Sequence, residues 1–175
     1  RLNMSANMIT GSTYVGSPTA KYDIDLSGLI SLYHALPTLK NPIELDISNC
    51  GLSVNGVNPV TKAISAGAAM TSINCLANNF GEDDLTTLLT AIEGTSVRSL
   101  CGLTEGQTTA DFSGQNLGPI DMKIMAAEYG FQGFIAAVTS INCLANQFGD
   151  DDLATLLTAI EGTSVRSLCG LTEGQ

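Results

Sequence analysis

The chain has 175 residues and a mass of 18.1 kDa, enough for one ordinary domain with a buried core. A hydrophobic fraction of 44% and a charged fraction of 14% exclude intrinsic disorder, and no apolar run is long enough to predict a membrane span. Seven basic and seventeen acidic residues give a net charge of −10, which argues against a nucleic-acid partner because such binding needs a positive surface.

An insertion follows the first strand-like segment. Residues 1–9 have the apolar spacing of a short strand and turn, whereas residues 10–24 are rich in loop-forming residues. We expect this insertion to be either a flexible excursion or a segment that a partner orders. Tyr14 and Tyr22 are its candidate contact residues, because loops often carry binding function.

Two helices and a strand are predicted next. Residues 25–36 predict a helix that ends before Pro37, since the residue before a proline disfavours the helical conformation. Residues 45–52 predict a strand that runs into a turn, and residues 59–66 predict a second helix.

The strand pattern is clearest in the next segment. Ile73 and Cys75 alternate with Ser72 and Asn74, so the two pairs are expected on opposite faces of a strand. Asn78 follows where the strand must turn. An asparagine side chain carries both a donor and an acceptor, so it can satisfy the backbone groups that the turn exposes.

The segment after this turn predicts a helix, because Leu85, Leu88, Leu89 and Ile92 lie three and four residues apart. It opens with the acidic runs 82–84 and, in a later copy, 150–152. Clustered carboxylates suggest calcium, but the spacing lacks the alternating oxygen ligands of a calcium loop. We interpret these acids as first-turn residues that suit the helix dipole.

The sheet position after this helix has two candidates. Residues 97–102 lie one repeat after Ile73, yet residues 108–112 also have a strand pattern, and Ala110 follows Leu103 by only seven residues. A parallel crossover needs about a dozen residues. We expect residues 97–102 to take the sheet position and 108–112 to form a hairpin with another segment; the rival register places 108–112 in the sheet.

A near-exact internal duplication completes the chain, after a further helix predicted from Pro119 to Ala127. Residues 71–107 and 139–175 differ only at Asn79/Gln147, Glu82/Asp150 and Thr86/Ala154, so 34 of 37 positions are identical.

These segments share a pattern of apolar residues followed by Asn or Cys, as at Cys50, Asn78 and Asn146, and the pattern resembles the leucine-rich repeat family. The step of 28 residues from Leu45 to Ile73 resembles its ribonuclease-inhibitor-like class. The resemblance implies an α/β fold: a leucine-rich-repeat solenoid, wound as a right-handed superhelix, with a parallel sheet on one face and helices on the other. We expect residues 1–175 to form a single array, a fragment of a longer chain, in which Leu45, Ile73 and Ile141 line up along one sheet.

The resemblance further implies a non-enzymatic scaffold for protein–protein interaction that recognises a protein partner or serves as a subunit of a larger assembly. The outward sheet face then carries the candidate partner-binding residues, although any sheet face must hold polar residues. Together with Tyr14 and Tyr22, these candidates are Glu44, Asp46, Ser72, Asn74, Ser140 and Asn142.

The residues that could carry chemistry are few. His34 is the only histidine, and the five cysteines form no C-x-x-C pair, so we expect no catalytic residue, no metal and no cofactor. Cys75 and Cys143 are expected in the core, whereas Cys101 and Cys169 have the parity of exposed positions. An odd number of unclustered cysteines favours an intracellular setting. Two alternatives stay open: a structural subunit without a ligand groove, and a hydrolase that uses His34.

Overall fold

Short parallel strands form the centre of the molecule. The structure, a computed structural model, describes residues 1–67, 69–130 and 133–171. One sheet contains β1 (Leu2–Asn3), β2 (Ile43–Asp46) and β3 (Met70–Asn74) in that order, and a second sheet pairs β4 (Thr109–Asp111) with β5 (Ser140–Asn142). All of these pairings are parallel. The chain is therefore an α/β protein with small parallel sheets.

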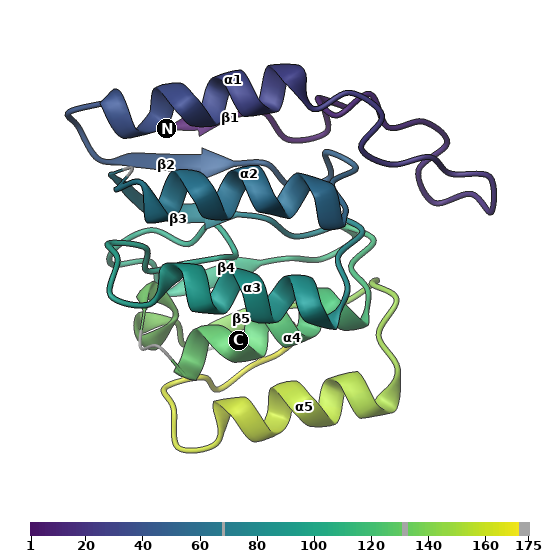
Figure 1. The fold of residues 1–175 in the computed structure, drawn as a ribbon. Coiled ribbons are helices and arrows are strands. Elements are labelled where there is room, and N and C mark those ends of the chain that lie inside the picture. The colour runs from purple at the N-terminus through teal and green to yellow at the C-terminus, as the bar shows by residue number, and fades with distance from the viewer. Residues whose placement is uncertain (68, 131–132, 172–175) are drawn as a thin grey trace.

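A helix follows each strand, because parallel neighbours need a crossover connection. Figure 1 shows α1, α2, α3 and α5 one below another in chain order, in front of the strands, and α4 packs against α5. Two 3-10 turns, Leu36–Thr38 and Phe134–Ala137, follow α1 and α4. The helices are α1 (Ser27–Ala35), α2 (Val54–Ser65), α3 (Glu82–Ile92), α4 (Pro119–Gly130) and α5 (Asp150–Ile160).

The strand residues that were predicted to face inward do so, but in two sheets. Leu45 pairs with Ile73 in the first sheet, and Ala110 pairs with Ile141 in the second; all four are buried in one hydrophobic core. The expectation that Ile141 continues the sheet of Leu45 and Ile73 is therefore wrong.

Residues 98–102 lie where the first sheet ends. The Arg98 N–H donates to the Thr71 carbonyl, and the Ile73 N–H donates to the Ser99 carbonyl, both at 2.8 Å. The segment thus runs beside β3, as predicted, but it bends and forms an isolated antiparallel bridge at Cys101 instead of a regular strand.

The next segment cannot pair with the same sheet. Too few residues separate Leu103 from Ala110 for a crossover, so β4 begins the second sheet and pairs in parallel with β5. The predicted hairpin of residues 108–112 is wrong, and so is the rival register, which placed them in the first sheet.

Helix α2 begins five residues before the predicted start at Pro59, which lies inside the helix. Its N-terminus is capped from the insertion. The Asp23 carboxylate accepts hydrogen bonds from the Ser53 hydroxyl at 2.7 Å and from the Gly56 N–H at 2.9 Å. A cap supplied from so far away leaves no local start signal in the sequence.

The turn asparagines act as predicted. Asn78 donates to the carbonyl of Ile47 in the preceding unit at 2.9 Å and accepts from the Cys50 and Leu52 amides. In the second sheet, Asn146 donates to the Phe112 carbonyl at 2.8 Å and accepts from an amide in the same way. Each side chain joins two successive turns.

A residue with a positive φ, in the left-handed backbone region, occurs four positions after each apolar strand residue that pairs with a neighbouring strand. Its φ values are +56°, +51°, +57°, +63° and +57° at Ala6, Asn49, Ala77, Gly114 and Ala145. Five segments, two of them identical copies, thus turn through the same backbone conformation.

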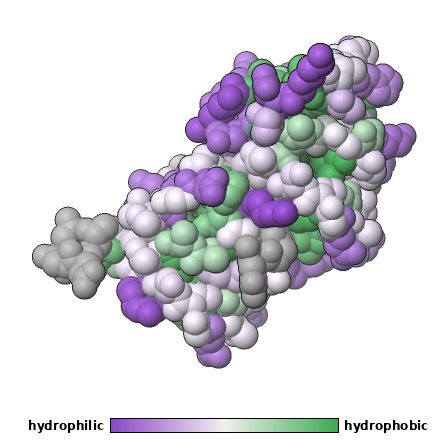
Figure 2. All heavy atoms as spheres, turned by 90° about the vertical axis from the view of Figure 1, so that its left-hand side faces the viewer, coloured by the Kyte–Doolittle hydropathy of each residue, from purple (hydrophilic) through white to green (hydrophobic). Residues whose placement is uncertain are grey.

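Within the described residues, no helix is both long and apolar enough to cross a membrane. Figure 2 shows the side of the molecule that lies at the left of Figure 1. Among the described residues on this side, hydrophobic patches are separated by hydrophilic side chains.

Candidate functional site

The predicted partner-binding residues of the sheet face are less accessible than their strand parity suggests. Ser72 and Ser140 are buried, and Glu44, Asn74 and Asn142 are half-buried. These residues therefore offer little accessible area to a partner.

Asp46 is also buried, and its carboxylate is already occupied. Arg1 Nη2 lies 3.0 Å from Asp46 Oδ2, and the Ser48 hydroxyl donates to Asp46 Oδ1 at 2.8 Å. Beside it, Asn74 is covered by Gly102: a Cβ on that glycine would lie 2.7 Å from the Asn74 Cβ. Intramolecular contacts therefore take up much of this face.

The insertion is anchored at its base. The Ser12 hydroxyl donates to the Gly51 carbonyl at 2.7 Å and accepts from the Asp23 N–H at 3.0 Å, and Thr13 bridges Lys21. The base is therefore held by the chain itself. Of the two candidate contact residues, Tyr14 is 72% exposed and Tyr22 is half-buried.

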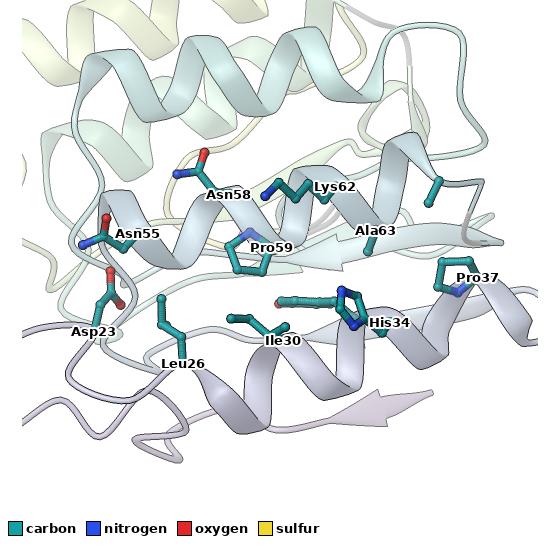
Figure 3. A pocket seen from close by; sticks show the side chains of 12 residues that line it. Asp23, Leu26, Ile30, His34, Pro37, Asn55, Asn58, Pro59, Lys62 and Ala63 are labelled. Atoms are coloured by element: carbon teal, nitrogen blue, oxygen red, sulfur yellow. The ribbon is translucent and has the colours of Figure 1, made fainter.

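A groove of about 770 Å³ lies between α1 and α2. Figure 3 shows Leu26 and Ile30 on the α1 side facing Pro59 and Ala63 on α2. Its floor is mostly apolar, and the polar groups of Asp23, His34, Asn55, Asn58 and Lys62 lie around it.

His34 is exposed at this groove, and no serine or cysteine is among the described residues that line it. Four cysteines are buried elsewhere, and burial raises the pKa of the Cys50 and Cys75 thiols, that of Cys50 to about 11. Such thiols are protonated at neutral pH and are weak nucleophiles.

The predicted exposure of Cys101 is wrong, because only 3% of it is accessible, whereas Cys169 at the equivalent position is exposed as predicted. Cys101 is buried because α4 covers this segment, where Glu128 accepts a hydrogen bond from the Cys101 N–H. Cys169 forms the same isolated bridge to its strand but has no such cover among the described residues. Burial also raises the pKa of the Cys101 thiol.

The acidic runs serve as helix starts. Asp84 accepts from the Gly81 N–H and Asp152 from the Gly149 N–H, both at 2.9 Å. Each acid thus binds the backbone N–H just before the first turn of its helix. No group of three His, Cys, Asp or Glu side chains that could hold a metal occurs in the described part of the chain.

Two buried carboxyls on α4 were not predicted. Asp121 accepts from the Ala77 N–H at 2.7 Å, and Glu128 accepts from the Ser99 hydroxyl at 2.8 Å and the Cys101 N–H at 2.7 Å. Burial raises the pKa of Asp121 and raises that of Glu128 to about 7, although the hydrogen bonds oppose the shift. Their spacing of seven residues, two helical turns, was the available sequence signal.

Through these contacts, α4 and its neighbouring segments cover one end of the first duplicate. The second duplicate has the same residues and no such cover among the described residues. Leu76 and Leu103 are fully buried or nearly so, whereas their counterparts Leu144 and Leu171 are 55% and 54% exposed. Leu157 on α5 is 51% exposed as well. We call Leu144, Leu157, Leu171 and Cys169 the C-terminal face.

The comparisons with known proteins leave the family open. No protein-family model matches the chain, and no curated protein matches it.

Proposed function

We propose that the chain is a leucine-rich-repeat scaffold of the ribonuclease-inhibitor-like class, a single array wound as a right-handed superhelix. Its function is protein–protein interaction, as a receptor for a partner or as a subunit of a larger assembly, without catalysis of its own.

Three features support the repeat assignment. Parallel strands alternate with helices, a left-handed residue recurs in five turns, and Asn78 and Asn146 each join their own turn to the preceding one. Cys50, which stands in the asparagine place one unit earlier, likewise reaches back to the Met4 carbonyl at 3.0 Å. This is the Asn/Cys alternation of the family pattern.

The groove between α1 and α2 carries the functional proposal. Its floor is mostly apolar, and Ile30 beside it is 39% exposed. Exposed apolar areas on a folded protein commonly mark contact surfaces.

The sheet face and the insertion, with Tyr14 and Tyr22, are the second candidate surface for the same function. The alternative of a structural subunit without a ligand groove is supported by Asp46, because Arg1 and Ser48 already contact its carboxylate. A hydrolase that pairs His34 with a serine or cysteine finds less support, because neither residue type is among the described residues that line the groove beside His34.

Co-purification from native material tests the proposal. Wild-type chain is compared with Ile30→Glu, which places a charge in the groove between α1 and α2, and with Leu157→Glu, a matched change at an exposed position of α5. We expect the wild type and Leu157→Glu to retain the same partner and Ile30→Glu to lose it.

Loss of the partner with Leu157→Glu alone would place the binding site on α5 and contradict the proposal. Both variants must keep the helical circular dichroism of the wild type, so that a loss of binding is not a loss of fold.

A further inference from the structure

The first turn of α2 contains an asparagine that is followed by a glycine. Asn55–Gly56 is the only Asn-Gly pair in the sequence. In such a pair the backbone nitrogen of the glycine can attack the side-chain carbonyl carbon of the asparagine, because the glycine has no Cβ to obstruct the approach. Asn55 is exposed at the groove between α1 and α2, so water reaches its side-chain amide.

The attacking nitrogen is held by the insertion. Gly56 is buried, and its N–H donates to Asp23 Oδ2 and to the Ser53 carbonyl, both at 2.9 Å. Amides in the first turn of a helix lack the usual partner one turn earlier, so without Asp23 this N–H would depend on the Ser53 carbonyl alone. The negative charge of the carboxylate also opposes loss of the amide proton, which an attack by this nitrogen requires.

The space around Gly56 explains why a glycine stands there. A Cβ at this position would lie 2.8 Å from Leu52 Cδ2 and 3.1 Å from Asp23 Oδ1. The close approach of Asp23 therefore needs a glycine, and this glycine makes the preceding asparagine reactive. The same contact that requires the reactive pair also restrains it.

The helical backbone adds a second restraint. Asn55 lies inside α2, and closing a ring between its side chain and the next amide requires its backbone to leave the helical conformation. Asp23 opposes this as well, because it accepts from the Ser53 hydroxyl at 2.7 Å and fixes the start of the helix. Attachment of the insertion to α2 therefore controls the reactivity of Asn55.

We propose that Asn55 is a modification site, at which deamidation occurs when the insertion releases α2 and is prevented while Asp23 holds the Gly56 amide. The Gly56 nitrogen forms a bond to Asn55 Cγ, the Cγ–Nδ2 bond breaks, and Nδ2 leaves as ammonia with the amide proton. Water then cleaves one of the two ring C–N bonds and yields aspartate or isoaspartate. Either product adds a carboxylate at the end of the groove where Figure 3 shows Asn55 and Asp23.

The test follows position 55 by mass spectrometry while the protein is incubated in mildly alkaline buffer. Trypsin releases residues 41–62 as one peptide, in which fragment masses distinguish the asparagines. Asn41 and Asn58 are internal references, because each precedes a proline, which has no N–H and cannot close the same ring. Urea-denatured wild-type chain gives the rate of the unrestrained pair.

Asp23→Ala removes the restraint, and Asp25→Ala is the matched control, because the Asp25 carboxylate accepts from the Ser27 N–H at the start of α1 instead. We expect slow deamidation in the folded wild type and in Asp25→Ala. We expect it to be faster by roughly tenfold or more in Asp23→Ala and in the denatured chain, because a protected group reacts only through local opening. If circular dichroism shows Asp23→Ala to be unfolded, Asp23→Asn, which removes only the charge, takes its place and should also react faster than the wild type.

Equal rates in the wild type and the folded Asp23 variant would overturn the inference. Equal acceleration in Asp25→Ala would overturn it too, since protection would then reflect overall stability. An Asn55 that stays intact in the denatured chain would show that this pair is no modification site.

Discussion

At the scale of single residues, the left-handed turn position is occupied mostly by residues that do not favour its backbone conformation. Three of its five occupants, Ala6, Ala77 and Ala145, are alanines, although a left-handed conformation costs an alanine about 1–2 kcal/mol relative to the usual helical region. The Ala6 N–H donates to the Ser48 carbonyl at 2.9 Å and the Ala77 N–H donates to the Asp121 carboxylate at 2.7 Å, and these bonds hold the two residues in place.

The strained conformation of these alanines predicts a stabilising substitution. Ala145→Gly should raise the free energy of unfolding by about 0.5–1 kcal/mol, since glycine adopts φ near +57° without strain and Ala145 is exposed. Ala154→Gly, at an exposed position inside α5, is the matched control and should lower it by about 1 kcal/mol. Urea denaturation measures the free energy of unfolding of both variants. A change of the same sign in both would contradict the interpretation that Ala145 is strained.

Glu128 predicts how stability depends on pH. Its pKa rises from 4.5 in the unfolded chain to about 7 in the folded protein because it is buried. The folded state therefore binds the proton more tightly, and this group's contribution falls as pH rises from about 4.5 to 7, by on the order of 3 kcal/mol.

Urea denaturation at pH 5 and pH 7 tests this sign. Glu128→Gln should lose the decline, whereas Glu105→Gln, at an exposed position, should retain it. The contradicting result is a wild-type protein whose unfolding free energy rises from pH 5 to pH 7 by as much as that of Glu128→Gln. It would mean that the buried Glu128 carboxyl ionises at little cost.

Residue-level prediction from sequence succeeded where regular geometry holds. Strand parity placed Cys75 and Cys143 in the core correctly. It failed at Cys101, which α4 covers, and it gave no account of Asp121 and Glu128, whose partners include amides in distant segments.

At the scale of elements, the turn asparagines connect one unit to the next. Asn78→Ala removes hydrogen bonds to the Ile47 and Cys75 carbonyls and to the Cys50 and Leu52 amides, so it should cost about 2–4 kcal/mol of unfolding free energy. Asn146→Ala should cost less, because its turn lies beside the exposed Leu144 and Ala145, where water can replace the lost bonds. Equal losses in thermal or urea unfolding would argue against this difference.

The cap on α2 predicts a coupled effect. Asp23→Ala should destabilise the protein by about 1–2 kcal/mol, because the Ser53 and Gly56 amides lose their acceptor. It should also increase proteolytic cleavage within residues 14–20, since Asp23 ties the insertion to α2. Tyr14→Ala, at an exposed position of the same insertion, should leave stability unchanged; a similar loss in both variants would contradict the capping role.

Helix prediction shows the same limit. The leucines of α3 and α5 have the spacing of an apolar face, and both helices occur where this spacing predicts them. The start of α2 was missed because its cap comes from Asp23, some thirty residues earlier, and the Pro59 signal therefore pointed to a false boundary.

At the scale of the whole molecule, the alternation of parallel strands and helices followed from the repeat pattern, but the division into two sheets did not. That division depends on residues 98–102, which pair with β3 while the following chain is too short to cross over. The same geometry recurs in the second duplicate, where the Arg166 N–H donates to the Thr139 carbonyl and the Gly170 N–H to the Ile141 carbonyl.

Native-state hydrogen exchange tests this central claim most directly, because the two duplicates offer nearly the same sequence in different surroundings. We predict slow exchange at the amides of Ala77 and Leu100, which the α4 carboxylates hold, and much faster exchange at Ala145 and Leu168. Equal protection in the two copies would contradict the account, since it would mean that the C-terminal face is as well covered as the first duplicate.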